Sequence, residues 1–476
     1  MVKLNTSQNL RRDEGEKSME TKQIIAVVLI VIIIAGVAVG VYMFLPPAAY
    51  GAVVVGQLVT PGAPAGTPSD RIIVVGILDP MTEIQGEGAW MGAYLACDEI
   101  NTAGGVVVGG ETYYFGLVSE DTSEADAELD ISKGTAAATK ILTQDNAQFI
   151  IGGFRTESLL AYQELVMDEK VLLFGTGAST DSFCQSVIDD YDRYKYFFRT
   201  MPINSTSLAR SLLYYILYLD GYLTAVTGQN ISKVAIIREG LDWTTGMSDF
   251  LMGALPFYGN LTVVENIAYP MTSEAADFAT YWNTIDASEA QITIPIISGS
   301  TGILMSTQYA QAQPKTLVAG INVMAQLDTY WNETGGGCEY EVVLQSTLRT
   351  NKTTLTIPFW DAFLSHYGSE PLYTAVGSYD SMYILAEGID RAQSFNSTLI
   401  IPHLEDMDAA SPFTGAGGNI AFTPGHDLLL GPTYSFTLFT QWQAGAVKEA
   451  VSTGGLLYPE NIVTGALVLP SWGINE

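Results

Sequence analysis

The chain has 476 residues, enough for one to three domains with a sizeable core. Its net charge is −30, because 51 Asp and Glu residues outweigh 21 Lys and Arg residues. This balance argues against binding to nucleic acid and against docking on anionic lipid. An apolar content of 48% argues against a disordered chain.

The first predicted element is an uncharged apolar segment from Ile24 to Leu45. At ~1.5 Å per residue, a helix of this length crosses a hydrocarbon layer of ~30 Å. A cleaved signal peptide is the alternative, although its apolar core usually has only about 7–15 residues. Lys and Arg residues precede the segment, and none follows before Arg71. The positive-inside rule then predicts a single-pass protein of the cell membrane, with a cytoplasmic tail at 1–23, a transmembrane anchor at 24–45 and the rest outside the cell.

Residues 46–70 are rich in Pro, Gly, Ala and Thr, which predicts a linker that holds the next domain off the membrane. Asn-x-Ser/Thr sequons suit the surface of an exported glycoprotein, and coincidental polar loops are the alternative. The sequons lie at Asn5, Asn204, Asn230, Asn260, Asn332, Asn351 and Asn396.

From Arg71 onward, continuous apolar runs alternate with segments of helical spacing, which predicts parallel strands covered by helices on both faces. Strands are expected at 71–78, 112–121, 149–153 and 171–176, and helices at 87–101, 124–144 and 158–169. After residues 196–202 the pattern begins again with a helix at 205–220 and strands at 233–239, 261–270, 292–299 and 316–322. The fold class is therefore α/β, with two doubly wound parallel-sheet lobes. Ligands bind outside the carboxyl ends of such strands, so a cleft between the lobes is the expected site.

Cysteines and histidines indicate no metal site. Outside the cell, a disulfide between Cys184 and Cys338 can form, which leaves Cys97 to pack as a small apolar residue in a helix. The three histidines show no metal-ligand spacing. No catalytic motif is present either, because the sequence has no G-x-S-x-G and the segment GEGAWMG at 86–92 lies too far from its strand for a pyrophosphate loop. We therefore expect no enzyme, no metal and no cofactor.

Four motifs in order resemble the type 1 periplasmic binding proteins, specifically the branched-chain amino acid (Leu/Ile/Val)-binding group of ABC transporter substrate-binding proteins. They are GAYLACDEINTAGG at 92–105, FGTGAST at 174–180 with YFFRTMP at 196–202, GSYDSMYILAEGIDRA at 377–392, and FTGAGGNIAFTPGHDLLLGPTYSF at 413–436. The resemblance implies a Venus-flytrap fold with a three-segment hinge near 199–202, 345–349 and 428–436. One lobe would hold 71–200 and 350–430, and the other 203–345 and 436–476.

The resemblance also implies ligand-binding residues. The turns after two first-lobe strands would hold a ligand carboxylate through Thr156 and through Ala178 and Ser179, and Ser158 could assist from the N-terminus of its helix. The alternative for the second turn is that Ser179 and Thr180 only cap the next helix.

Three further positions follow the family pattern less well. Trp243 corresponds to an aromatic residue that covers the ligand, with a core tryptophan as the alternative. Gln85 stands where an aromatic is common, and Asn322 stands where amino-acid binders carry the acid that pairs with the ligand ammonium. Glu157, Glu239 and Asp242 are candidate substitutes for that acid.

The predicted function is capture of a small polar ligand, an amino acid or another small carboxylate, and its delivery to an ABC permease. A ligand-sensing ectodomain that works with a membrane signalling partner and a cell-surface scaffold of the same fold are the alternatives.

Overall fold

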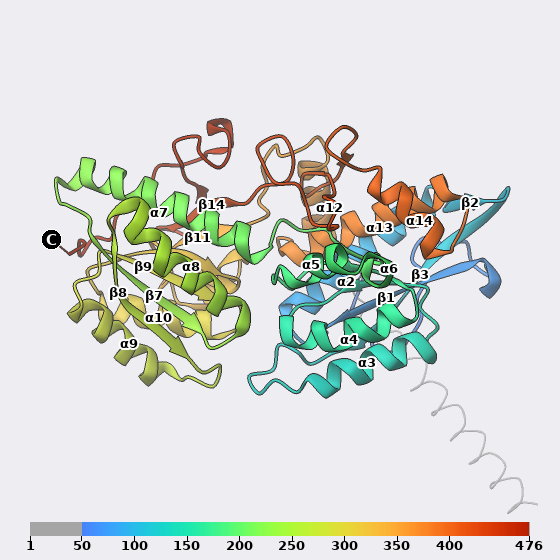
Figure 1. The fold of residues 1–476 in the computed structure, drawn as a ribbon, viewed down its shortest axis with the longest axis horizontal. Helices are drawn as coiled ribbons and strands as arrows, with labels where there is room; N and C mark the ends of the chain where they lie inside the picture. Colours follow the sequence, from blue (N-terminus) through green and yellow to red (C-terminus); the bar gives the residue numbers. More distant parts are fainter. Residues whose placement is uncertain (1–49, 476) are drawn as a thin grey trace, which may run out of the picture. The chain divides into compact units, whose positions relative to one another are not determined.

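The computed structural model describes residues 50–475 (Figure 1). The predicted cytoplasmic tail, the predicted anchor at 24–45 and the sequon at Asn5 lie outside these residues. No helix within 50–475 is long and apolar enough to cross a membrane. From Val53 onward the described chain belongs to one compact unit, which contains both sheets.

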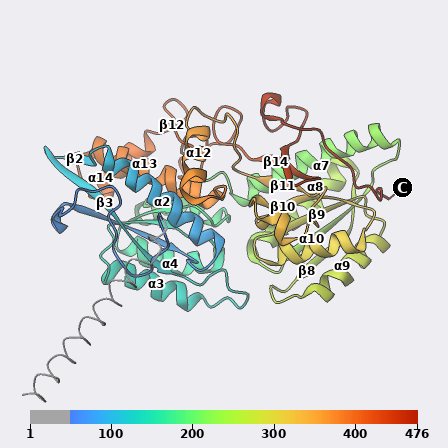
Figure 2. The same ribbon diagram turned by 180° about the vertical axis from the view of Figure 1, so that it is seen from behind.

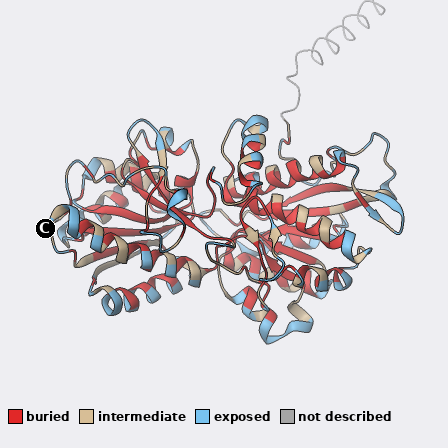
Figure 3. Ribbon diagram, turned by 90° about the horizontal axis from the view of Figure 1, so that it is seen from above, coloured by how far each residue is buried: buried red, intermediate tan, exposed pale blue. Residues whose placement is uncertain are grey.

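The first lobe, residues 53–199 and 356–420, is built on a six-stranded sheet in the order β2-β3-β1-β4-β5-β6. Its strands are β1 (Ile72–Asp79), β2 (Val106–Val108), β3 (Glu111–Asp121), β4 (Phe149–Gly152), β5 (Leu172–Gly175) and β6 (Phe197–Arg199). All neighbours pair in parallel except β2 and β3. The central strands are buried on both faces, as their unbroken apolar sequences predict (Figure 3).

Helices cover both faces of the first sheet, with α13 and α14 on one side and α3 and α4 on the other (Figure 1). The helices are α2 (Ile84–Thr102), α3 (Ile131–Thr143), α4 (Thr156–Asp168), α5 (Ser182–Asp189), α6 (Tyr191–Tyr194), α12 (Thr356–Tyr367), α13 (Tyr373–Ala392) and α14 (Ser397–Glu405). Helices α2 and α13 pack closely at Gly92, where a Cβ atom would lie 1.9 Å from the Ala375 carbonyl oxygen. Only glycine permits that contact.

The second lobe, residues 205–345 and 438–475, has a seven-stranded sheet in the order β15-β14-β11-β10-β9-β7-β8. Its strands are β7 (Lys233–Glu239), β8 (Thr262–Tyr269), β9 (Ile292–Ile297), β10 (Leu317–Asn322), β11 (Val342–Gln345), β14 (Leu438–Gln443) and β15 (Val447–Ala450). Helices α7 (Ser205–Thr227) and α8 (Asp242–Gly259) pack together, as do α9 (Ala275–Ala287) and α10 (Thr301–Ala312) (Figure 2). The short elements of the described chain are α11 (Tyr330–Glu333), η1 (Ser69–Arg71), η2 (Met324–Gln326), η3 (Glu460–Ile462) and the hairpin β12 (Phe413–Thr414) and β13 (Asn419–Ile420).

The two-lobe α/β fold agrees with the prediction, but both sheets are mixed rather than purely parallel. Strand β2 is antiparallel to β3, β14 to β11, and β15 to β14. Tight turns explain two of these three pairs, because Gly109–Gly110 and Gly445–Ala446 have positive φ and join β2 to β3 and β14 to β15 as hairpins. Such short connections can link only antiparallel strands.

One predicted helix starts later than expected. The spacing predicts a helix over 124–144, whereas α3 begins at Ile131 after Asp130, whose side chain accepts a hydrogen bond from the Ser132 amide. Glu124 is instead fully buried, and its Oε1 accepts from the Phe154 amide at 2.9 Å. Because its carboxylate forms a hydrogen bond inside the lobe, Glu124 cannot also lie in the first turn of an exposed helix.

The segment predicted as a linker lies partly against the first lobe. The amide of Gly56 donates to the Ser119 carbonyl at 2.8 Å, and Val59 pairs with Leu117 in an antiparallel bridge. Asn101 Nδ2 donates to the Pro61 carbonyl at 2.6 Å. Residues 53–61 therefore cover the first lobe, and the spacing of the domain from a membrane stays a prediction.

The chain passes between the lobes three times, at 200–204, 346–355 and 421–437. Lys352 joins two of these crossovers, because its Nζ donates to the carbonyls of Ser346 at 2.6 Å and Phe436 at 2.5 Å. Arg199, at the end of β6, forms an ion pair with Asp427 at 3.0 Å and so joins the first crossover to the third. The hinge is thus held by two basic side chains.

The three cysteines are free and buried, so the predicted Cys184–Cys338 disulfide is absent from the described residues. Cys184 belongs to α5 of the first lobe, whereas Cys338 lies in the second lobe between α11 and β11. Cys97 packs in the core of the first lobe, as expected.

Candidate functional site

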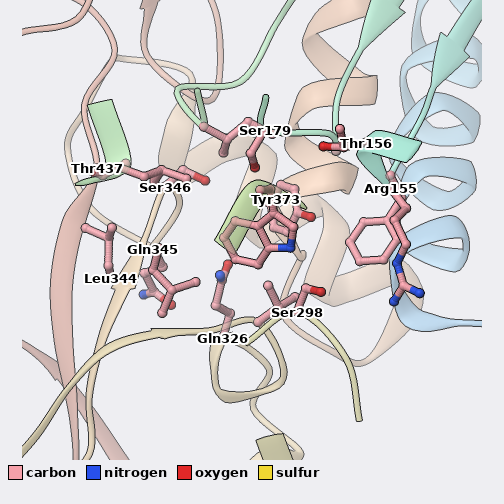
Figure 4. Close-up of a pocket in the computed structure, with 17 residues that line it drawn as sticks. Arg155, Thr156, Ser179, Ser298, Gln326, Leu344, Gln345, Ser346, Tyr373 and Thr437 are labelled. Carbon is pink, nitrogen blue, oxygen red and sulfur yellow. The ribbon is translucent and has the colours of Figure 1, made fainter. Parts of the chain in front are cut away.

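A cavity lies between the two lobes, and a boundary between domains is a common position for a small-molecule site. Its walls come from both lobes and from all three crossovers (Figure 4). The lining residues are Phe154, Arg155, Thr156, Gly177, Ser179, Ile203, Leu208, Trp243, Ser298, Ile321, Val323, Gln326, Leu344, Gln345, Ser346, Tyr373 and Thr437.

The position of the cavity follows from the direction of the strands. Lining residues come at or just beyond the carboxyl ends of β4 and β5 in the first lobe, and of β9, β10 and β11 in the second. In a parallel sheet these ends meet at one edge, where backbone amides and the N-termini of the following helices remain available to a ligand. The two edges enclose the cavity from opposite sides.

The turn between β4 and α4 places the N-terminus of α4 at the cavity. Arg155 is the N-cap residue and Thr156 is the first helical residue, and both line the wall. Arg155 is only 2% exposed, and its Nη1 donates to the Asp126 carbonyl at 3.1 Å. Its Nε and Nη2 have no partner in the described protein, and neither has the Thr156 hydroxyl. This corner therefore offers positive charge and free donors to an anion.

The second turn, FGTGAST, is shaped by Arg199. The guanidinium of Arg199 donates to the carbonyls of Ala178 and Thr180, and the Ala178 amide donates to the Gly153 carbonyl at 2.8 Å. Both backbone groups of Ala178 are thus already bonded, whereas the half-buried Ser179 lines the cavity. The Thr180 hydroxyl accepts from the Ser182 amide at 3.4 Å in the first turn of α5. Ser179 therefore faces the cavity, and its neighbour Thr180 caps the next helix.

Trp243 stands in the first turn of α8 and lines the cavity from the second lobe. It is half-buried and belongs to neither lobe's buried core. Trp243 is therefore not the core tryptophan that the sequence offered as an alternative.

Four predicted site residues, Gln85, Ser158, Ala178 and Asn322, do not line the cavity. Ser158 is fully buried and faces α3, where a Cβ atom on Gly134 would lie 2.3 Å from its Oγ. Asn322 points into the second lobe, with its Nδ2 2.7 Å from the Tyr330 hydroxyl and 2.9 Å from Glu341 Oε1. The backbone carbonyl and amide of Ala178 are already hydrogen-bonded, to Arg199 and to Gly153. The structure thus brings Thr156, Ser179 and Trp243 together, and their contact with a ligand stays a prediction.

Gln85 has a different position, because it joins the lobes. Its Nε2 donates to the Ser298 carbonyl at 3.2 Å across the cleft. Other contacts also cross between the lobes, among them those from the Asp242 amide to Glu157 Oε1 at 3.1 Å and from Lys448 Nζ to Glu370 Oε2 at 2.9 Å. The described lobes are therefore in a closed arrangement around the cavity.

Sequence reasoning missed several polar side chains of the wall. Gln345 is 2% exposed, and neither its Nε2 nor its Oε1 has a partner in the described protein. The Oε1 of Gln326 is also unpartnered. Gln345 ends the apolar run VVLQ, a polar residue at a strand's carboxyl end that could have been identified. Buried polar groups without partners are costly, so their gathering here marks a ligand site.

One buried acid lies behind the cavity wall. Glu239, at the end of β7, accepts from Ser298 Oγ at 2.6 Å and from the Gly299 amide at 2.8 Å. Burial raises the pKa of Glu239, and these hydrogen bonds lower it, with a smaller contribution from the charge of Arg155.

Comparison with known proteins gives consistent results. The periplasmic binding protein family model matches residues 72–440. A Leu/Ile/Val-binding protein homolog 8 of Brucella abortus is 21% identical over 383 residues, which is 79% of this chain and 87% of the relative.

Solved structures share the fold at low sequence identity. The branched-chain amino acid transporter substrate-binding protein LivJ of Streptococcus pneumoniae, in complex with isoleucine, has a TM-score of 0.64 and 16% identity, covering 80% of this chain and 99% of that protein. A solute-binding protein of R. palustris in complex with benzoate has a TM-score of 0.62 and 15% identity, covering 84% and 99%. One from Rhodopseudomonas palustris BisB5, in complex with 3,4-dihydroxybenzoic acid, has a TM-score of 0.61 and 19% identity, covering 78% and 93%.

Proposed function

Because the chain belongs to the periplasmic binding protein family, we propose that it is a membrane-tethered, extracellular substrate-binding protein of an ABC transporter. It captures a small polar ligand between its lobes and delivers it to a permease in the membrane. Family members of this type are binding proteins rather than enzymes. The chain therefore acts by closing on its ligand, which contacts both lobes and shifts the population toward the closed form.

One observation carries this proposal. Unpartnered polar side chains from the first lobe (Arg155 and Thr156) and from the second (Gln326 and Gln345) face the same cavity. A ligand that bonds to both sets gains more in the closed form than in any form with separated lobes. Ligand-driven closure follows directly from that difference in affinity.

The membrane tether rests on sequence alone. The apolar segment at 24–45 and the Lys and Arg residues before it support an N-terminus in the cytoplasm and a binding domain outside. Within the described residues, the sequons at Asn230, Asn260, Asn332, Asn351 and Asn396 are exposed, which suits glycosylation of an exported domain. Asn204 is buried, and its Oδ1 accepts from the Ser207 amide at 2.7 Å as the cap of α7. We expect no glycan there.

The test is a thermal-shift screen of the full-length protein against amino acids, organic acids, peptides and sugars. We expect at least one small carboxylate to raise the unfolding temperature, because a ligand that binds only the native state stabilises it. At 100 times its Kd, such a ligand contributes about 2.7 kcal/mol.

The matched control is Trp243→Ala. This change removes a half-buried wall residue outside the core and should weaken the ligand-induced shift while leaving the ligand-free protein folded. An absence of any stabilising compound in the whole panel would refute ligand capture and favour the scaffold alternative. A hit without permease and ATPase genes beside this one would favour sensing over transport.

A further inference from the structure

The charge of the cavity wall restricts the ligand class. Among the described residues that line it, Arg155 is the one charged side chain, and none is Asp or Glu. The remaining polar groups are hydroxyls and the two amides of Gln326 and Gln345. A zwitterionic amino acid would bring an ammonium group into this wall without a carboxylate to receive it.

The acids that could serve an ammonium group are engaged elsewhere. The family position is Asn322, and its amide is turned toward Glu341, which also accepts from Ser306 Oγ inside the second lobe. Glu239 lies behind Ser298 and accepts hydrogen bonds on both of its oxygens. Glu157 accepts from the Asp242 amide of the other lobe and does not line the cavity.

The cavity has two chemically different ends. Figure 4 shows Arg155 and Thr156 at one end and Leu344 and Gln345 at the other. The first end has the N-terminus of α4 and the unpartnered donors of Arg155. The rest of the wall is uncharged and combines the apolar side chains of Ile203, Leu208, Ile321, Val323 and Leu344 with hydroxyls and with the amides of Gln326 and Gln345. A ligand that fits this wall has an anionic head and an uncharged body.

We propose that the ligand is a monocarboxylate with an uncharged body and without an ammonium group. This inference rests on the proposed function, whose site it refines. Arg155 and the first turn of α4 hold the carboxylate, and the uncharged remainder of the wall holds the body. An added ammonium group loses its hydration without gaining an ionic partner, which opposes binding.

Matched ligand pairs test the inference on the unaltered protein. Isothermal titration of the full-length protein compares leucine with 4-methylpentanoate, and phenylalanine with 3-phenylpropanoate, which differ only in the amine. We expect each amine-free acid to bind at least about tenfold more tightly than its amino acid, and benzoate to bind more tightly than the neutral benzamide.

Two variants give independent readouts. Arg155→Met should remove the preference for benzoate over benzamide, because that preference depends on the positive charge. Gln326→Glu replaces a wall amide by a carboxylate of the same shape and should shift the preference toward leucine over 4-methylpentanoate.

The outcomes separate this inference from the proposed function. Tighter binding of leucine than of 4-methylpentanoate by the unaltered protein would overturn the inference and leave ligand capture intact. So would a panel in which only sugars or peptides stabilise the protein. An empty panel would overturn the proposed function itself, and with it the inference.

Discussion

Replacement of Arg199 by Met is expected to lower the free energy of unfolding by about 3–5 kcal/mol. The guanidinium is fully buried, donates to the Ala178 and Thr180 carbonyls, and forms an ion pair with Asp427. Met fills a similar volume but leaves two carbonyls and one carboxylate without this partner. Because the same side chain holds the FGTGAST turn against the third crossover, ligand affinity should fall as well.

Urea unfolding of the variant and the unaltered protein measures this effect, with Arg193→Met as the control. Arg193 also pairs with acids, Glu164 at 2.6 Å and Asp168 at 2.8 Å, but these side chains are substantially exposed to solvent. Exposed pairs contribute about 0–1 kcal/mol, so the control should change little. Equal losses in the two variants would mean that Arg199 has no special role in the hinge.

The protein should become less stable as the pH rises from 5 to 7. Burial raises the pKa of the carboxyl groups of five buried residues, Asp79, Glu124, Glu239, Glu341 and Asp380. The pKa of Glu124, Glu341 and Asp380 rises to about 7. A carboxyl group with a raised folded-state pKa stabilises the native protein below its unfolded pKa, and this contribution is lost as the pH rises through the folded value.

The expected loss is on the order of a few kcal/mol, because each unit of pKa difference is worth about 1.4 kcal/mol. Burial lowers the pKa of Lys352 to about 7, and this opposing effect lies above pH 7, outside the window. Urea unfolding at pH 5 and pH 7 at constant ionic strength measures the change. Glu341→Gln should reduce the difference, because the amide keeps a hydrogen-bonding side chain beside Ser306 and Asn322 without a titrating group. A stability that rises across this window would contradict the assignment of buried, protonated carboxyls.

The two lobes could be predicted because their strands are continuous apolar runs. Such runs are typical of a sheet that is buried on both faces. Strands such as β1 and β9 show this pattern clearly. The antiparallel edges could not be predicted in the same way, because β14 and β15 carry mixed polar and apolar residues and depend on a turn at Gly445. The start of α3 was predicted too early because buried carboxylates are rare, so the sequence around Glu124 was interpreted as part of a surface helix.

The site could be predicted at the level of turns but not at the level of side-chain directions. Ser158 follows Thr156 by two residues, and a helix turns by about 200° over that distance, so the two cannot face the same cavity. Asn322 lies between Ile321 and Val323, which line the wall, and alternation along the strand directs it the other way. Arg155 was missed because nothing in the sequence says that two nitrogens of its guanidinium, Nε and Nη2, stay without a partner beside Thr156.

The most direct test of ligand capture between the lobes is a crystal structure of the protein grown with a compound that stabilises it. We predict that the ligand lies between Thr156 and Ser179 on one side and Trp243 on the other, with an anionic group within hydrogen-bond distance of Arg155. A ligand bound on an outer surface, with this cavity unchanged and filled by water, would contradict the account.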